Sequence, residues 1–113
     1  MSSVELQAIE NNIKQAQKTA DLGDSLERLK SNRDFKKIVL EGYFEQEAIR
    51  LVHLKSDPNM QSADSQKAIA TQMDAIGMFK QYLGLVSFKA ALAGKSIEAD
   101  EYARDELLEE GAE

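Results

Sequence analysis

Residues 51–69 read LVHLKSDPNMQSADSQKAI, and they contain Pro58, the only proline of the 113-residue chain. Long stretches of helix-forming residues lie on both sides of it. The residue before a proline is disfavoured in helical geometry, and Ser56-Asp57-Pro58-Asn59 has the composition of a turn. The sequence therefore predicts two long helices, residues 33–55 and 64–93, that reverse direction at this turn and pack as an antiparallel hairpin.

Both predicted helices of the hairpin carry wide apolar faces at helical spacing. A face this wide is more than one neighbouring helix can cover. For the helix at residues 33–55 we therefore expect packing between two neighbouring helices, or between one neighbour and another subunit. The residues predicted to carry the core and the interactions are Phe35, Ile38, Phe44, Ile49, Ile76, Phe79 and Leu83.

A narrower apolar seam precedes the hairpin. Leu6, Ile9, Ile13, Ala16 and Ala20 recur at alternating spacings of three and four, which predicts a helix over residues 3–22. This helix either packs on the body of its own chain or associates with a second copy.

Capping residues predict where the helices begin and end. Gly23 is expected to end the N-terminal helix, and Asp24 to start a short helix over residues 25–30. Asn32 is expected to cap the first helix of the hairpin, and either Ser62 or Asp64 the second. Gly94 is expected to end that second helix, and Ser96 to cap a last, acidic helix peripheral to the rest.

Gly77 and Gly84 lie seven residues apart and so share one face of the predicted helix 64–93. Each costs about 1 kcal/mol relative to alanine inside a helix. Two interpretations account for them. Either they permit another helix to approach closely, with Gly42 as a candidate contact, or Gly84 marks a kink or break.

The charge is concentrated at the C-terminal end. The whole chain carries −6, whereas residues 98–113 alone carry −7, because Arg104 is their only basic residue. We therefore predict a helical domain at residues 1–97 and an acidic arm at 98–113. The arm either keeps the protein in solution, docks on a basic surface, or mimics nucleic-acid phosphates. Its acidic residues are Glu98, Asp100, Glu101, Asp105, Glu106, Glu109, Glu110 and Glu113.

Lys30, Arg33, Lys36 and Lys37 form the basic cluster of the chain. It is either an ordinary solvated face or a contact for the acidic arm of the same or a neighbouring subunit. Aromatic residues are not interleaved with it as in a surface that stacks nucleic-acid bases, and the net charge is negative. The sequence therefore predicts no direct binding of nucleic acid.

Residue patterns typical of catalysis or metal binding are absent. The chain has no cysteine, and His53 is its only histidine. A Glu-x-x-His di-iron motif would need glutamate where Arg50 stands. The glycines form no phosphate-binding loop, and no stretch has the roughly 20 apolar residues that span a bilayer. We therefore predict a non-enzymatic protein without metal, cofactor, small-molecule substrate or membrane contact.

Three stretches, residues 32–44 (NRDFKKIVLEGYF), 47–51 (EAIRL) and 75–83 (AIGMFKQYL), resemble small helical proteins encoded by tailed bacteriophages. The resemblance covers about half of the chain. It implies a structural or assembly role in the virion, for example in a head, a portal-proximal layer or a scaffold. It transfers no site residues. Scaffolds that bind coat protein through a C-terminal helix usually make that helix basic, and this chain departs from that pattern.

Together these features predict an all-α fold that works through protein partners, as a homo-oligomer or as a subunit of a larger assembly, in the virion or the host cytoplasm. The expected function is that of a non-enzymatic virion structural or assembly protein of a tailed phage, acting through helix–helix packing. The alternative is an acidic phage-encoded inhibitor or adaptor that binds one host protein.

Overall fold

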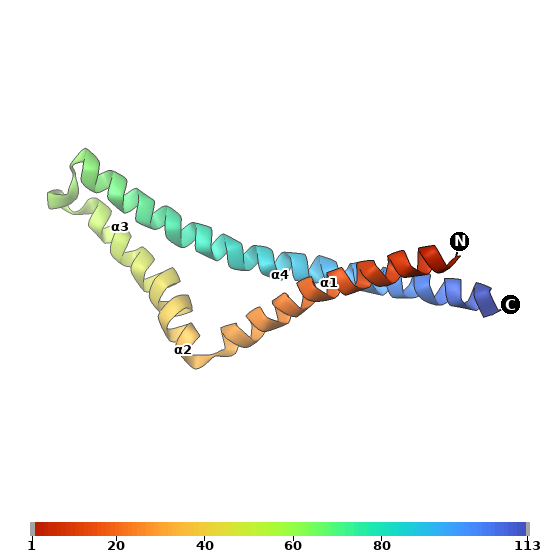
Figure 1. Cartoon of the computed structure of the whole chain (residues 1–113). Coiled ribbons are helices and arrows are strands. Elements are labelled where there is room, and N and C mark those ends of the chain that lie inside the picture. Colours follow the sequence, from red (N-terminus) through yellow and green to blue (C-terminus); the bar gives the residue numbers. More distant parts are fainter. Residues whose placement is uncertain (1, 113) are drawn as a thin grey trace. The chain divides into compact units, whose positions relative to one another are not determined.

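The structure is a computed structural model, and it describes residues 2–112. In this part of the chain every regular element is helical, which confirms the predicted all-α class (Figure 1). The elements are α1 (Ser2–Ser31), α2 (Arg33–Phe35), the π-helix η1 (Lys36–Glu47), α3 (Ala48–Ser56), the 3-10 helix η2 (Pro58–Met60) and α4 (Ala63–Ala112).

These elements form two compact units. The hairpin unit comprises residues Glu27–Gly84, and the terminal unit comprises the described residues up to Leu26 and from Leu85 onward. Each unit has its own packed helices.

The turn of the hairpin unit forms where the proline predicts it. Asp57 is extended, and its carboxylate accepts a hydrogen bond from the backbone N–H of Asn59 at 2.8 Å. Pro58 then starts η2, where its missing N–H is no loss because the first helical N–H groups have no partner within the helix. Ser62 caps α4 by accepting from the backbone N–H of Ser65 at 3.1 Å, as predicted.

Two glutamine side chains fix the geometry of this turn. Gln61 donates to the backbone carbonyl oxygens of Lys55 at 2.9 Å and Asp57 at 2.7 Å. Gln66 donates to Lys55 at 3.0 Å and Met60 at 2.8 Å. Lys55, which receives both bonds, lies in the last turn of α3, where carbonyl groups lack a donor from the helix itself. The angle between α3 and the start of α4 is therefore set by side chains as well as by Pro58.

The core of the hairpin unit lies between α3 and the first half of α4. Leu51 and Ile69 are fully buried, and Ile76 extends the same cluster two helical turns further along α4. The predicted antiparallel hairpin is confirmed by this packing. The half-buried residues that surround the three are Tyr43, Phe44, Ala48, Leu54, Met60 and Met73.

The π-helix η1 changes which apolar face points inward. Its i→i+5 bonding gives roughly 4.4 residues per turn instead of 3.6. Ile38 is therefore rotated away from Phe35 and is 68% exposed, and Ile49, in the following α3, is 51% exposed. The expectation that Ile38 and Ile49 share a core face was thus wrong for this chain, because it assumed α-helical spacing throughout.

Gly42 suits the widened turn of η1. A Cβ atom at this position would lie 3.0 Å from the backbone carbonyl oxygen of Lys37, five residues earlier. Glycine leaves that space empty, so the carbonyl is not crowded.

The terminal unit pairs α1 with the second half of α4. The seam of Leu6, Ile9 and Ile13 is half-buried and continues through Gly23 to Leu26, both buried. The opposing seam on α4 also repeats at spacings of four and three. Its members are Val86, Ala90, Ala93, Ile97, Asp100, Arg104 and Leu107, all buried or half-buried. The N-terminal seam therefore packs on its own chain, as one of the two predicted alternatives stated.

Two predicted helix ends were wrong. α1 continues through Gly23, and α4 continues through Gly94 to Ala112. A glycine that ends a helix usually adopts positive φ, and no described glycine does so. At Gly23 the reason is tertiary: an added Cβ would collide with the Cβ of Ala90, so the glycine permits close helix approach. The acidic segment is therefore not a separate helix, and the predicted division at residue 98 stays a prediction.

Gly77 and Gly84 follow neither predicted interpretation. α4 does not break at either residue, and nothing lies within 4 Å of a Cβ atom built on either one. The close approach predicted for them occurs at Gly23 instead.

Candidate interaction surfaces

Large apolar side chains remain exposed on both units. In the hairpin unit the two most exposed are Ile38 and Met78, each 68% exposed. In the terminal unit Phe88 is 61% exposed, and Leu85 and Leu92 lie three and four residues to either side of it on α4. Residues at these spacings lie on one face of a helix, so they form a stripe in contact with water.

The predicted core and interaction residues fall into four groups, from the most buried to the most exposed. Ile76 and Phe44 belong to the hairpin core, Phe35 and Leu83 are half-buried, and Phe79 is partly exposed. The last group is Ile38 and Ile49, which face solvent. That any of the seven binds a partner stays a prediction.

Three aromatic rings meet at the open edge of the hairpin core. The ring centres of Phe44 and Phe79 are 5.4 Å apart, and those of Tyr43 and Phe79 are 6.2 Å apart with nearly perpendicular planes. These are favourable distances for tilted and edge-to-face pairs. Phe79 thus joins α4 to η1 while part of its ring stays accessible.

The basic cluster lines a cleft at the corner where α1 ends. Asn32 is extended there, and its side chain accepts from the backbone N–H of Phe35 at 2.9 Å, which confirms the predicted cap. The cleft has a volume of about 500 Å³ and is lined by Ser31, Arg33, Lys36, Lys37 and Glu41. Lys30 turns away and pairs with Glu27 at 3.6 Å.

The three cations of the cleft have no carboxylate partner. The ion pairs Lys30–Glu27, Arg50–Glu47 and Arg104–Asp105 do not involve them, and within residues 2–112 no carboxylate pairs with Arg33, Lys36 or Lys37. All three are exposed. The cleft therefore presents a net positive charge to solvent, three cations against the single carboxylate of Glu41.

The acidic residues lie on the outer side of α4. Glu98, Glu101 and Glu109 are exposed, whereas Asp100 is half-buried in the seam with α1. Asp105 pairs with Arg104 at 3.5 Å. A hydrogen bond with Glu106, helped by its negative charge and by slight burial, raises the pKa of Tyr102 above its usual value of 10.0. Glu113 lies outside the described residues.

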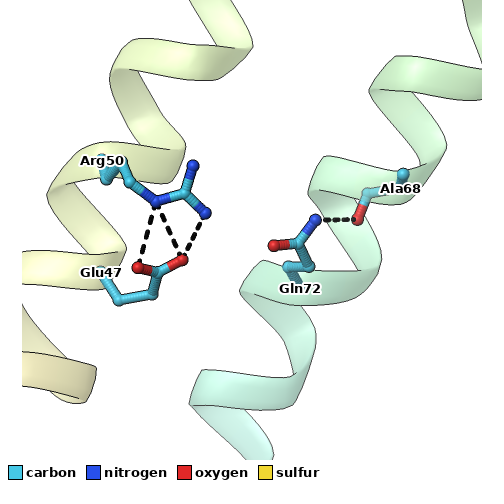
Figure 2. Close-up of polar contacts among 4 residues, drawn as sticks. All are labelled: Glu47, Arg50, Ala68 and Gln72. Carbon is cyan, nitrogen blue, oxygen red and sulfur yellow. Dashed lines mark hydrogen bonds and ion pairs between the residues drawn. The ribbon is translucent and has the colours of Figure 1, made fainter.

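One ion pair stands out on the outer surface of the hairpin unit. Figure 2 shows the Arg50 side chain on the carboxylate of Glu47, with Nε 3.1 Å from both carboxylate oxygens. This hydrogen bond, together with the charge of Arg50, lowers the pKa of Glu47. The same figure shows Gln72 donating to the carbonyl oxygen of Ala68 at 3.5 Å on α4. Both contacts are local to one helix, so they stabilise helices rather than define a site.

Residues 2–112 show neither a metal site nor a membrane-spanning helix. No group of three or more His, Asp or Glu side chains lies close enough to hold a metal ion. No helix in this part of the chain is long and apolar enough to cross a membrane. A groove of about 490 Å³ in the terminal unit is lined by charges of both signs, including Lys14, Asp21 and Arg104.

Comparison of the chain with protein-family models, with curated proteins and with solved structures finds no match. The resemblance to small phage proteins therefore stays a prediction. The function has to be argued from the surfaces described above.

Sequence reasoning missed two features of the hairpin unit. It did not find the locking role of Gln61 and Gln66, because glutamine is common on helices and no local pattern marks the bond. It ranked Leu51 and Ile69 among many apolar residues, although they are the most deeply buried. The predicted apolar faces included both residues, but periodicity alone does not show which residues are buried most deeply.

Proposed function

We propose that the chain is a non-enzymatic structural or assembly protein that acts through helix–helix packing, in a phage virion or in the host cytoplasm. The observation that carries the proposal is the exposure of large apolar side chains on helix faces of both units. Large contiguous apolar patches are rare on the surface of monomeric proteins, and where they occur they mark sites of interaction. The phage setting rests on the sequence resemblance alone.

The partner that fits these faces is another helix. Leu85, Phe88 and Leu92 repeat at spacings that one helix presents to a neighbour. In the hairpin unit Ile49 and Val52 repeat in the same way on α3, and each is about half exposed. Burying such side chains contributes roughly 25 cal/mol per Å² of apolar area. The proposal therefore expects a homo-oligomer or a place in a larger assembly.

Light scattering coupled to size-exclusion chromatography tests this proposal, at tens of micromolar protein and at low and high salt. A discrete oligomer that persists at high salt supports apolar assembly, because salt screens charges but does not weaken apolar packing. A monodisperse monomer at both salts contradicts it. A variant with Phe88→Ser and Leu92→Ser should shift an oligomer toward smaller mass. The matched control, Ser87→Ala and Ala91→Ser, changes intervening positions without removing large apolar groups.

A second candidate function is an acidic inhibitor or adaptor, and one observation favours it. The carboxylates of Glu98, Glu101 and Glu109 are ordered on a helix and exposed, which is the arrangement a basic partner protein would recognise. Deleting residues 98–113 is not a clean test, because it also removes Asp100, Arg104 and Leu107 from the seam that packs on α1. Exchanging Glu98, Glu101 and Glu109 for glutamine removes the charge and keeps the seam. Loss of a partner on this exchange, with steep salt dependence, supports the second candidate.

A further inference from the structure

We propose that the basic cleft at Arg33, Lys36 and Lys37 is a docking site for the acidic end of α4 from a second copy of this chain. The inference concerns a contact between charged surfaces. It rests on the proposed function only in taking another copy as the partner.

The cleft has the properties of a docking site for a carboxylate-rich helix. Its three cations are exposed and have no ion pair within the described part of the chain. Arg33 of α2 and Lys36 and Lys37 at the start of η1 all line this one cleft. The cleft holds about 500 Å³. Such a volume accommodates several side chains of a partner.

The acidic end of α4 supplies the complementary surface. Residues 98–113 carry −7, and Glu98, Glu101 and Glu109 face outward at helical spacing. Their carboxylates are the groups that arginine and lysine bind most strongly. On this segment Tyr102 is 68% exposed. Ile38, which follows Lys37 in the sequence, is also 68% exposed.

A second copy is the occupant that the charges favour. The rest of the chain, residues 1–97, is nearly neutral at +1, so the excess negative charge of the molecule is concentrated at the acidic end. Every copy carries one of each. Because the two surfaces differ, the contact is heterologous, and it extends to rings or chains of copies.

Complementary charge reversal tests the inference in the full-length chain. The cleft variant carries Arg33→Glu, Lys36→Glu and Lys37→Glu, and the acidic-end variant carries Glu98→Lys, Glu101→Lys and Glu109→Lys. The matched control carries Lys55→Glu, Lys67→Glu and Lys80→Glu at three exposed positions of the hairpin unit. Its formal charge changes by the same amount as that of the cleft variant. Circular dichroism first confirms that each variant is as helical as the native chain. Sedimentation velocity then gives the mass at about 50 mM and about 500 mM NaCl, where screening differs strongly.

The native chain and the control should have a larger mass at low salt than at high salt. Each reversal variant alone should show at low salt the mass that the native chain has at high salt. An equimolar mixture of the two variants should regain mass, because the native acidic end of the cleft variant can dock in the native cleft of the acidic-end variant. Recovery in the mixture also shows that both variants are folded.

Three results would overturn the inference: a native mass that does not depend on salt, a cleft variant that behaves like the control, or a mixture that does not regain mass. A salt-dependent change of shape without a change of mass would place the contact within one chain and would also overturn it. A protein that is monomeric at high salt but larger at low salt supports the inference and contradicts apolar assembly. An oligomer of equal mass at both salts does the reverse, so the two proposals fail separately.

Discussion

In the hairpin unit, large apolar and aromatic side chains close over Leu51 and Ile69, whereas in the terminal unit two helices meet along small residues such as Gly23 and Ala90. The first arrangement depends on filling a volume. The second depends on keeping a volume empty so that backbones approach closely. The two units should therefore respond in opposite ways to the same kind of substitution.

The largest expected effect is in the core of the hairpin unit. Ile69 is 1% exposed, so Ile69→Ala should lower the free energy of unfolding by about 2–5 kcal/mol through lost burial and an unfilled cavity. Ile49→Ala makes the same chemical change at a half-exposed helical position, and it should cost less than about 1 kcal/mol. Urea unfolding followed by circular dichroism measures both. Equal losses would show that the core is not where the structure places it.

The terminal unit should be most sensitive to added volume at Gly23. Gly23→Ala collides with Ala90 and should destabilise the unit by about 1–3 kcal/mol, although alanine favours the helix itself. Gly84→Ala meets nothing within 4 Å and should instead stabilise by about 0.5–1 kcal/mol. Thermal unfolding of both variants gives the sign of each change.

A compensating variant sharpens this test. Adding Ala90→Gly to Gly23→Ala restores the empty space, so the double variant should recover part of the lost stability despite a second glycine penalty. If the double variant were less stable than Gly23→Ala by the full helix penalty of glycine, the two residues would not be in contact.

The aromatic edge of the hairpin unit should show a smaller, pairwise effect. Phe44→Ala and Phe79→Ala each remove a ring from the same cluster, and their effects should not add. A double-mutant cycle should give a coupling free energy of about 0.5–1.5 kcal/mol for rings at 5.4 Å. Independent effects of the two substitutions would mean that η1 and α4 do not meet at these rings.

The smallest expected effect is the pH dependence of the Glu47–Arg50 pair. The pKa of Glu47 is lower in the folded chain than in the unfolded one, so its contribution is present above the unfolded pKa. It is lost as the pH falls through the folded-state pKa. Glu47→Gln should therefore lower the urea midpoint slightly at neutral pH and not at all in strong acid. Glu45→Gln is the control, because Glu45 is exposed and forms no ion pair in residues 2–112. A difference that grew in acid would contradict the pairing.

Part of the candidate surfaces could be read from the chain before folding. The acidic end and the basic cluster are both visible as local runs of charge, and their exposure follows from the cost of burying unpaired charges. The cleft itself was not predictable, because it forms only where Asn32 turns the chain between α1 and α2. The exposed stripe at Phe88 was not predictable either. Its apolar residues look like core until the seam at Val86, Ala90 and Ala93 is seen to take the inner side of α4.

The sequence by itself determined the helical class, the turn at Pro58 and the caps at Asn32 and Ser62, because each depends on interactions among residues a few positions apart. Only the tertiary structure decided that α1 runs through Gly23, that η1 turns Ile38 outward and that the acidic end of α4 packs on α1. The first and the last of these depend on contacts between residues far apart in the chain. Such contacts contribute more free energy than the local preference of one glycine, which is about 1 kcal/mol.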